Sequence, residues 1–443
     1  VYGTAWQYLI GLLLLPAKFV KTFLATASWQ ANDAYYVFVV VVTRLFSVAA
    51  GTLAIYLTWR LAARLFGRSA GVIAAALLAV SLYHCSNSAF ATLDVPMSCL
   101  LLLLFLAAAR SAWAICGVIA GVLMGMKVVA IIFAAAPLLL IAVQWIESRK
   151  EPGAGAAHLR AAGVYAGVAS VVLLVTTPHM FFHPVEFWTY LARVKRGWYD
   201  PAQDASLGIR SQGALWNIQM AVGTPLIVAF LGGALLSLRK PSAIKMIALA
   251  AIAIYFAFWG GFLVPRYVIV VAPLLCVFAA FFYATLLEAS LPAVRIAAIA
   301  VLAAVLAVCL SDCLAAVDMR LRDTRPRAAA YIAGAIPPGE SIGIVSLYGP
   351  ARKLAWRYPV IDFRRYRQLS ALDQPSYLLL TSYDAEDLER TRGSSKPPPP
   401  RLLALYDELR SNRSNYRLMA EFVPAHQVPI EFPPPDIRVY RRE

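Results

Sequence analysis

The sequence predicts an α-helical polytopic membrane protein with a small α/β domain at its C-terminal end. Of its 443 residues, 60% are hydrophobic and only 14% are charged, whereas soluble globular proteins carry about 25% charged residues. The hydrophobic residues form long runs, such as residues 95–109 and 293–310, and only helices or closed barrels satisfy their backbone in lipid. Barrel strands would alternate with a period of two residues, and these runs do not. After residue 317 the chain becomes rich in charged residues and proline.

We predict a transmembrane domain of about ten helices over residues 37–317. Several hydrophobic runs are shorter than the ~20 residues of a full span, so their boundaries are approximate. Residues 1–36 are predicted to be an interfacial segment on the outer face, with Trp6, Tyr8 and Trp29 at headgroup level. The alternative is one more span there, which would reverse every later loop. The ten predicted spans are residues 37–59, 70–84, 93–109, 113–127, 129–146, 162–178, 214–238, 244–260, 265–287 and 294–316.

Basic residues predict the orientation of these spans. The net charge is +16, but the basic residues are scattered among membrane loops and the tail, so we expect no nucleic-acid partner. Short loops rich in Lys and Arg stay on the cytoplasmic side. The rule predicts a multi-pass protein of the plasma or inner membrane whose residues 318–443 are extracytoplasmic. The loops assigned to the cytoplasm carry Arg60, Arg64, Arg68, Arg110, Arg149, Lys150, Arg160, Arg239, Lys240, Lys245 and Arg295.

The tail, residues 318–443, is predicted to be an α/β domain. Residues 341–346 and 376–381 are short apolar runs typical of buried strands, and residues 327–335 are predicted to form a helix before the first strand. Residues 393–400 contain four consecutive prolines and are predicted to be an extended loop.

The six cysteines all lie in or beside hydrophobic runs, which favours free thiols over a disulfide framework. Cys309 and Cys313 share one helix face, so a metal ligand pair there is an alternative to their being small helix residues. The sequence has no Walker motif, no glycine fingerprint after a strand and no zinc-protease helix. We therefore expect no ATP-driven step within this chain.

Three ionisable residues stand at predicted outer ends of spans. Asp94 follows the stretch of residues 83–93, Lys127 follows a glycine-spaced helix, and Arg266 follows Pro265. Ionisable groups at membrane depth are usually functional, and the two cations could neutralise a phosphate. The alternatives are a helix cap for Asp94, a snorkelling anchor for Lys127 and an interfacial anchor for Arg266.

The loop from residue 176 to residue 200 holds a second candidate group. His179 and His183 are four residues apart, a spacing that suits a metal on a helix, although prolines on both sides make a regular helix doubtful. They are candidates for binding a divalent metal or an acceptor. A basic cluster formed by Arg193, Lys195 and Arg196 could contact an anionic headgroup. A solvated loop face is the alternative for the whole group.

Several segments together resemble the type C glycosyltransferases, the membrane superfamily of protein O-mannosyltransferases and lipid A aminoarabinose transferases. Residues 89–97 (AFATLDVPM) resemble the second acidic motif of that superfamily, residues 121–127 (GVLMGMK) its Gly-to-Lys segment, and residues 265–273 (PRYVIVVAP) its Arg-Tyr-to-Pro segment. Residues 2–15 are similar to the end of its first outer loop, and residues 44–67 to its next span and basic turn.

The resemblance implies a glycosyltransferase with an outer cavity and a polyprenyl-phosphate sugar donor. Asp94 matches the second acid and is the candidate catalytic residue, while Lys127, Arg266 and Tyr267 match positions that bind the donor phosphate. The acceptor would be a lipid, a glycan or a protein. The first acidic motif of the superfamily would lie before Tyr2, so we expect an N-terminally truncated chain that turns over poorly by itself.

Two other classes of function remain open from the sequence. A transporter or flippase of polyprenyl-linked sugars would share the apolar groove and the cations, but transporters often show related halves, and we find no convincing internal repeat. A membrane scaffold with an outer binding domain would leave the acid and the cations at the outer face unexplained.

Overall fold

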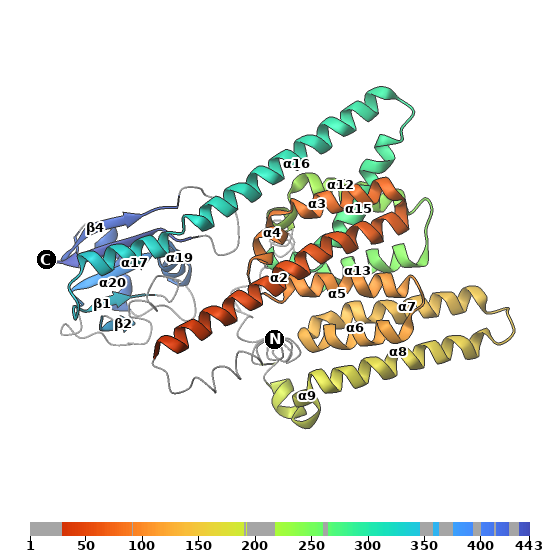
Figure 1. The fold of residues 1–443 in the computed structure, drawn as a ribbon, viewed down its shortest axis with the longest axis horizontal. Coiled ribbons are helices and arrows are strands. Elements are labelled where there is room, and N and C mark those ends of the chain that lie inside the picture. The colour runs from red at the N-terminus through yellow and green to blue at the C-terminus, as the bar shows by residue number, and fades with distance from the viewer. Residues whose placement is uncertain are drawn as a thin grey trace. The chain divides into compact units, whose positions relative to one another are not determined.

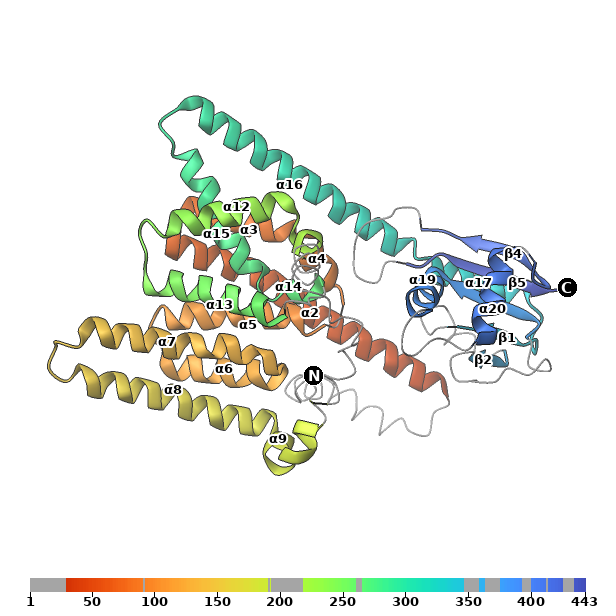
Figure 2. The same ribbon diagram turned by 180° about the vertical axis from the view of Figure 1, so that it is seen from behind.

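A computed structural model of the chain forms two compact units, Val1–Cys313 and Leu314–Glu443, shown as ribbons in Figures 1 and 2. The second unit begins at Leu314, four residues before residue 318, where the tail domain is predicted to start. Three predicted features lie outside the described residues: residues 1–28 of the interfacial segment, the basic cluster of Arg193, Lys195 and Arg196, and residues 393–399 of the proline loop. The structure describes residues 29–90, 92–189, 192, 218–259, 265–345, 358–362, 375–392, 400–411, 413–424 and 434–443.

The first unit is helical throughout its described part. Its helices are α2 (Trp29–Phe66), α3 (Arg68–Ala79), α4 (Leu82–Ser88), α5 (Asp94–Ala108), α6 (Trp113–Met126), η1 (Val128–Ala130), α7 (Ile131–Ser148), α8 (Ala154–Thr176), α9 (Pro178–Phe182), α12 (Thr224–Ser237), α13 (Ala243–Trp259), α14 (Pro265–Val268), α15 (Ala272–Leu287) and α16 (Pro292–Leu321).

Each of the ten predicted spans overlaps one of these helices or a pair of them. Among the described residues, α2, α7, α8 and α16 contain stretches long and apolar enough to cross a membrane, and α3 with α4 is a fifth candidate although the pair is bent by 61°. The helices α5, α6, α12, α13 and α15 are apolar but shorter. The predicted class, a polytopic helical membrane protein, is confirmed. That each shorter helix crosses the membrane stays a prediction.

One boundary prediction is wrong. Residues 29–36 are helical and continuous with the first span, because α2 runs without interruption from Trp29 to Phe66. The 38 residues of α2 measure about 57 Å at 1.5 Å per residue, which exceeds a hydrocarbon core of roughly 30 Å. Residues 29–36, predicted to belong to a separate interfacial segment, therefore continue the helix of the first predicted span.

The core of the first unit is built around α15, which packs against α12, α3, α2 and α5. Most of its residues are buried, from Ala272 through Ala280 and again at Tyr283 and Ala284. Gly233 on α12 permits this packing, since a Cβ atom there would lie 1.8 Å from the carbonyl oxygen of Phe278.

Helices α6, α7 and α8 run side by side in both views (Figures 1 and 2). The glycine spacing of α6 explains the contact between α6 and α8. Cβ atoms added at Gly117 and Gly121 would each lie 2.7 Å from a backbone oxygen of α8, those of Tyr165 and Ala169. Small residues allow helix backbones to approach closely in lipid.

Side chains from alternate loops meet at one end of the bundle. Arg64, in the last turn of α2, donates to the carbonyl oxygen of Ala109 at the end of α5 (2.6 Å). Lys245, at the start of α13, lies 4.8 Å from the ring centroid of Phe66. These three loops are among those predicted to be cytoplasmic, and they share an end of the unit.

The second unit contains a five-stranded sheet of order β2-β1-β3-β5-β4. The pairs β1–β2 and β1–β3 are parallel, whereas β5 is antiparallel to both β3 and β4. The strands are β1 (Ile342–Ile344), β2 (Val360–Asp362), β3 (Tyr377–Thr381), β4 (Tyr416–Phe422) and β5 (Ile437–Arg442), and the helices are α17 (Thr324–Ala335), α19 (Ser382–Thr391) and α20 (Pro400–Arg410).

Helices cover both faces of this sheet. Successive strand residues point to opposite faces, so Tyr377 and Leu379 join a hydrophobic cluster with Ala328 and Ile332 of α17. Leu378 and Leu380 join a second cluster with residues of α19 and α20. The predicted α/β domain is confirmed, including the two strands and the helix that the sequence indicated.

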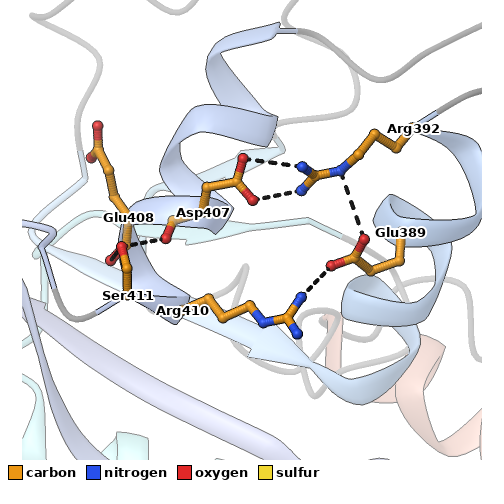
Figure 3. A network of polar contacts seen from close by, with 6 residues as sticks. All are labelled: Glu389, Arg392, Asp407, Glu408, Arg410 and Ser411. Carbon is orange, nitrogen blue, oxygen red and sulfur yellow. Dashed lines mark hydrogen bonds and ion pairs between the residues drawn. The ribbon is translucent and has the colours of Figure 1, made fainter.

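Ion pairs connect α19 and α20 (Figure 3). Arg392 contacts Asp407 through both terminal nitrogens (3.2 and 2.5 Å) and lies 3.7 Å from Glu389. Arg410 donates to Glu389 at 2.7 Å. All four side chains are substantially exposed, so this network orients the two helices more than it stabilises them.

Candidate functional site

Asp94 is the first residue of α5 and is 3% exposed. The preceding residue, Leu93, occupies the N-cap position and has no side-chain acceptor, so the helix start does not depend on a capping side chain. Pro96 in the first turn suits a helix start because its missing N–H would have no partner there. The Asp94 carboxylate accepts a hydrogen bond from Lys127, so its role is not explained by capping alone.

Lys127 follows the last residue of α6, where the backbone becomes extended (φ −155°, ψ 125°). Its Nζ atom lies 3.0 Å from Oδ1 of Asp94, and both side chains are 4% exposed. A lysine buried this deeply requires a partner because desolvation of an unpaired ammonium is costly. The ion pair is therefore a specific arrangement of two charges, and Lys127 does not snorkel to the surface.

The ring of Tyr267, on α14, forms one wall beside this ion pair. Nζ of Lys127 lies 3.9 Å from the ring centroid, a cation–π distance. Tyr267 is 2% exposed, and its carbonyl oxygen accepts a hydrogen bond from the Tyr255 hydroxyl at 2.8 Å. Tyr255 stacks on Phe133, with ring centroids 5.1 Å apart. The packing of α13 and α7 thus fixes the backbone that carries Tyr267.

Arg266 precedes Tyr267 and approaches the same ring, with its guanidinium carbon 5.4 Å from the centroid. The structure therefore brings together all four residues that the sequence associated with catalysis and phosphate binding: Asp94, Lys127, Arg266 and Tyr267. The formal charges of this cluster, which we call the Asp94–Arg266 cluster, sum to +1. Two cations and a phenol beside one carboxylate can accommodate an added anion such as a phosphate.

The short helix α4 packs against α14 and adds polar side chains that the sequence analysis did not single out. His84, Ser86 and Asn87 are buried. The Nε2 atom of His84 lies 3.2 Å from the carbonyl oxygen of Gly51, which makes Nε2 the donor and Nδ1 an acceptor. Nδ1 is buried without a hydrogen-bond partner among the described residues. The dense run of polar residues before Asp94 was the available signal for this group.

The histidine pair forms a separate group. His179 and His183 stack with ring centroids 4.9 Å apart, and both lie near Glu186, at 3.9 and 3.6 Å. These side chains are at least half exposed. In Figure 2, α9 lies apart from α14. Within the described part of the chain, no set of three or more His, Cys, Asp and Glu side chains is arranged to hold a metal ion, so metal binding stays a prediction.

Part of the sequence is similar to a known protein family. Residues 27–182 match the family described as dolichyl-phosphate-mannose-protein mannosyltransferase. The predicted resemblance to the type C membrane glycosyltransferases is thereby confirmed. The matched segment contains Asp94 and Lys127, whereas Arg266 and Tyr267 lie beyond it. A search of curated protein sequences finds no match.

A comparison with solved structures gives the following similarities. ArnT from Cupriavidus metallidurans bound to undecaprenyl phosphate has 15% sequence identity and a TM-score of 0.45, over 90% of this chain and 84% of ArnT. The Archaeoglobus fulgidus oligosaccharyltransferase in complex with Zn and sulfate has 15% identity and a TM-score of 0.45, over 90% of this chain and 62% of that enzyme.

Proposed function

We propose that this protein is a glycosyltransferase that moves a sugar from a polyprenyl-phosphate donor to an acceptor on the extracytoplasmic face of the membrane. The observation that carries the proposal is the Asp94–Arg266 cluster, in which the buried Asp94, Lys127 and Tyr267 meet the partly buried Arg266 among apolar helices. The match of residues 27–182 to a family named for a dolichyl-phosphate donor supports the same substrate class.

In the proposed reaction, an acceptor hydroxyl or amide attacks the anomeric carbon of the sugar. The bond between that carbon and the phosphate oxygen breaks, and the polyprenyl phosphate leaves with the bonding electron pair. Lys127 and Arg266 would stabilise the charge on the departing phosphate, and cations act most strongly where water is excluded. The Tyr267 hydroxyl would donate to a phosphate oxygen.

Asp94 would have two roles in this scheme. Without donor, its carboxylate holds Lys127 in place at 3.0 Å. When a phosphate binds beside Lys127, the two anions share one ammonium group. The carboxylate, which then shares its ammonium partner with the phosphate, would be available to accept a proton. A proton from the acceptor would pass to such a base in the transition state.

The orientation is part of the proposal. Arg64 and Lys245, at the end of the bundle predicted to be cytoplasmic, contact Ala109 and Phe66. Asp94 and Lys127 stand at the opposite ends of α5 and α6 from the turn that joins those helices. The positive-inside rule then assigns the cluster, and the C-terminal unit, to the extracytoplasmic side. The acceptor would be a lipid, a glycan or a protein on that side.

The test is sugar release from radiolabelled polyprenyl-phosphate sugars, mannose first, by the full chain in proteoliposomes. We expect slow release by the wild-type chain and a further loss of at least tenfold in rate for Lys127→Met. The matched control is Lys245→Met, which removes a lysine that also faces an aromatic ring but at the other end of the bundle. Movement of intact lipid-linked sugar across the bilayer without bond cleavage would instead identify a flippase. The absence of both sugar release and lipid movement would favour a scaffold.

A further inference from the structure

Two cysteines far apart in the sequence meet at the break between α3 and α4. The thiol of Cys85, on α4, donates to the carbonyl oxygen of Ala79 at 2.9 Å. The thiol of Cys313, on α16, donates to the carbonyl oxygen of Val80 at 3.3 Å. Because the two acceptors belong to consecutive residues, the two sulfur atoms lie as neighbours at the same helix end.

The two thiols also satisfy carbonyl groups at the end of α3. The last carbonyl groups of a helix lack partners within it, so the thiols could serve only to satisfy the end of α3. A serine hydroxyl would do so better, because a thiol is a weak donor. A disulfide requires two neighbouring thiols, and here they come from Cys85 and Cys313, which are 228 positions apart in the sequence.

We propose that Cys85 and Cys313 form a redox-sensitive disulfide that fastens α16 to the broken span. The two neighbouring sulfur atoms would approach each other to the S–S bond length of about 2.05 Å. Both residues are partly exposed, whereas Cys99, Cys116 and Cys276 are buried and have no comparable access to an oxidant.

The depth of Cys313 also suits oxidation from the aqueous phase. Cys313 lies 21 residues after Pro292, the first residue of α16, which corresponds to about 32 Å of helix. A hydrocarbon core is roughly 30 Å thick, so a helix that starts at one interface brings Cys313 to the opposite one. Cys309, one turn earlier on α16, lies deeper.

The oxidant would be a disulfide compound, which oxidising compartments supply. The thiolate of Cys85 attacks one sulfur of the oxidant, forms a mixed disulfide and releases one thiol. The thiolate of Cys313 then attacks the Cys85 sulfur, forms the Cys85–Cys313 bond and releases the second thiol. Both protons lost by the cysteines end on the released thiols, so two cysteines are oxidised and one external disulfide is reduced.

This bond would join α4 to α16. Cys85 is adjacent to His84 on α4, which borders the Tyr267 helix α14. Cys313 belongs to the helix that leads into the C-terminal unit. The inference does not depend on the proposed transferase activity, because its test measures thiols and not turnover.

The test uses the full chain in lipid nanodiscs, treated with oxidised glutathione and compared with a dithiothreitol-reduced sample. Remaining thiols are then counted by denaturation and labelling with a polyethylene-glycol maleimide, which adds one gel shift per thiol. We expect the oxidised wild-type chain to lose two of its six labels. Protease digestion and mass spectrometry of the same sample should give a peptide pair joined through Cys85 and Cys313.

Three variants sharpen the result. Cys85→Ser and Cys313→Ser should each abolish the two-label loss, whereas Cys309→Ser, one turn away on the same helix, should keep it. Retention of all six labels by the oxidised wild-type chain would overturn the proposal. So would mass spectra that join Cys85 to Cys309, a result that needs no variant to fold.

Discussion

Removal of one partner from the Asp94–Lys127 pair should destabilise the protein more than removal of both. The two charges are 3.0 Å apart, and each side chain is 4% exposed. Lys127→Met preserves the length of the side chain but leaves the carboxylate without its ammonium. Asp94→Asn preserves the shape of the acid but leaves the ammonium without its carboxylate. The double variant removes both charges, so neither is left buried and unpaired.

The structure sets the size of these effects. At 3.0 Å and an effective dielectric constant of about 20, the attraction is roughly 5–6 kcal/mol before desolvation is subtracted. Breaking a buried pair from one side costs about 3–5 kcal/mol. Lys127→Met also loses a cation–π contact with Tyr267, worth up to ~2 kcal/mol when desolvated. Because the double variant leaves neither charge unpaired, its loss should be smaller than either single loss, which places it at least about 3–5 kcal/mol below their sum.

The assay is reversible unfolding in mixed micelles with increasing dodecyl sulfate, read by circular dichroism for the wild-type chain and the three variants. Lys245→Met serves as the control, since Lys245 is only partly buried and its loss should change the unfolding free energy by about 1 kcal/mol or less. Strictly additive losses for Asp94→Asn and Lys127→Met would refute the reasoning, because independent sites do not couple.

Three further outcomes follow from local geometry. Gly121→Ala should destabilise the chain by about 1–3 kcal/mol because its Cβ would meet α8 at 2.7 Å. Gly163→Ala, whose Cβ would meet nothing within 4 Å, should instead stabilise the chain by up to ~1 kcal/mol. Thermal unfolding of the two variants should therefore shift the melting temperature in opposite directions. Thr381→Ala should cost about 1–2 kcal/mol, since the Thr381 hydroxyl belongs to the capping box of α19; equal melting of variant and wild type would contradict this. Arg392 holds the pKa of the Asp407 carboxyl below its usual range through a hydrogen bond. The interaction therefore stabilises the fold above about pH 4 and is lost as the pH falls through the lowered pKa. The difference in melting temperature between wild type and Arg392→Ala should shrink on acidification, and a constant difference would exclude the ion pair as its cause.

The sequence predicted the membrane helices well because long apolar runs have few alternatives in lipid. It also predicted β1 and β3, which are buried on both faces. The strands β4 and β5 were not predicted, since Arg417, Glu421 and Arg438 interrupt their apolar residues with charge. The start of α2 was misplaced because the composition of residues 29–36 resembles that of an interfacial segment, whereas the backbone continues the helix.

For the candidate site, the sequence predicted the residues but not how they contact one another. Loop counting assigned Asp94, Lys127 and Arg266 to one end of the bundle. The direct pairing of Asp94 with Lys127 depends on how α5 and α6 are rotated about their axes, which apolar helices with little periodicity do not reveal. The support of Tyr267 by Tyr255 depends on packing between α13 and α14, for which no sequence signal exists.

The central claim is that the Asp94–Arg266 cluster binds the phosphate of a polyprenyl lipid, and equilibrium binding tests it most directly. Undecaprenyl phosphate is titrated into the full chain in nanodiscs and bound lipid is counted by native mass spectrometry. Arg266→Ala should weaken binding by about 10- to 150-fold, which corresponds to the roughly 1.5–3 kcal/mol of a hydrogen bond to a charged group. Arg64→Ala, which removes an arginine at the opposite end of the bundle, should bind within about twofold of wild type. Equal affinities for Arg266→Ala and Arg64→Ala would contradict the claim.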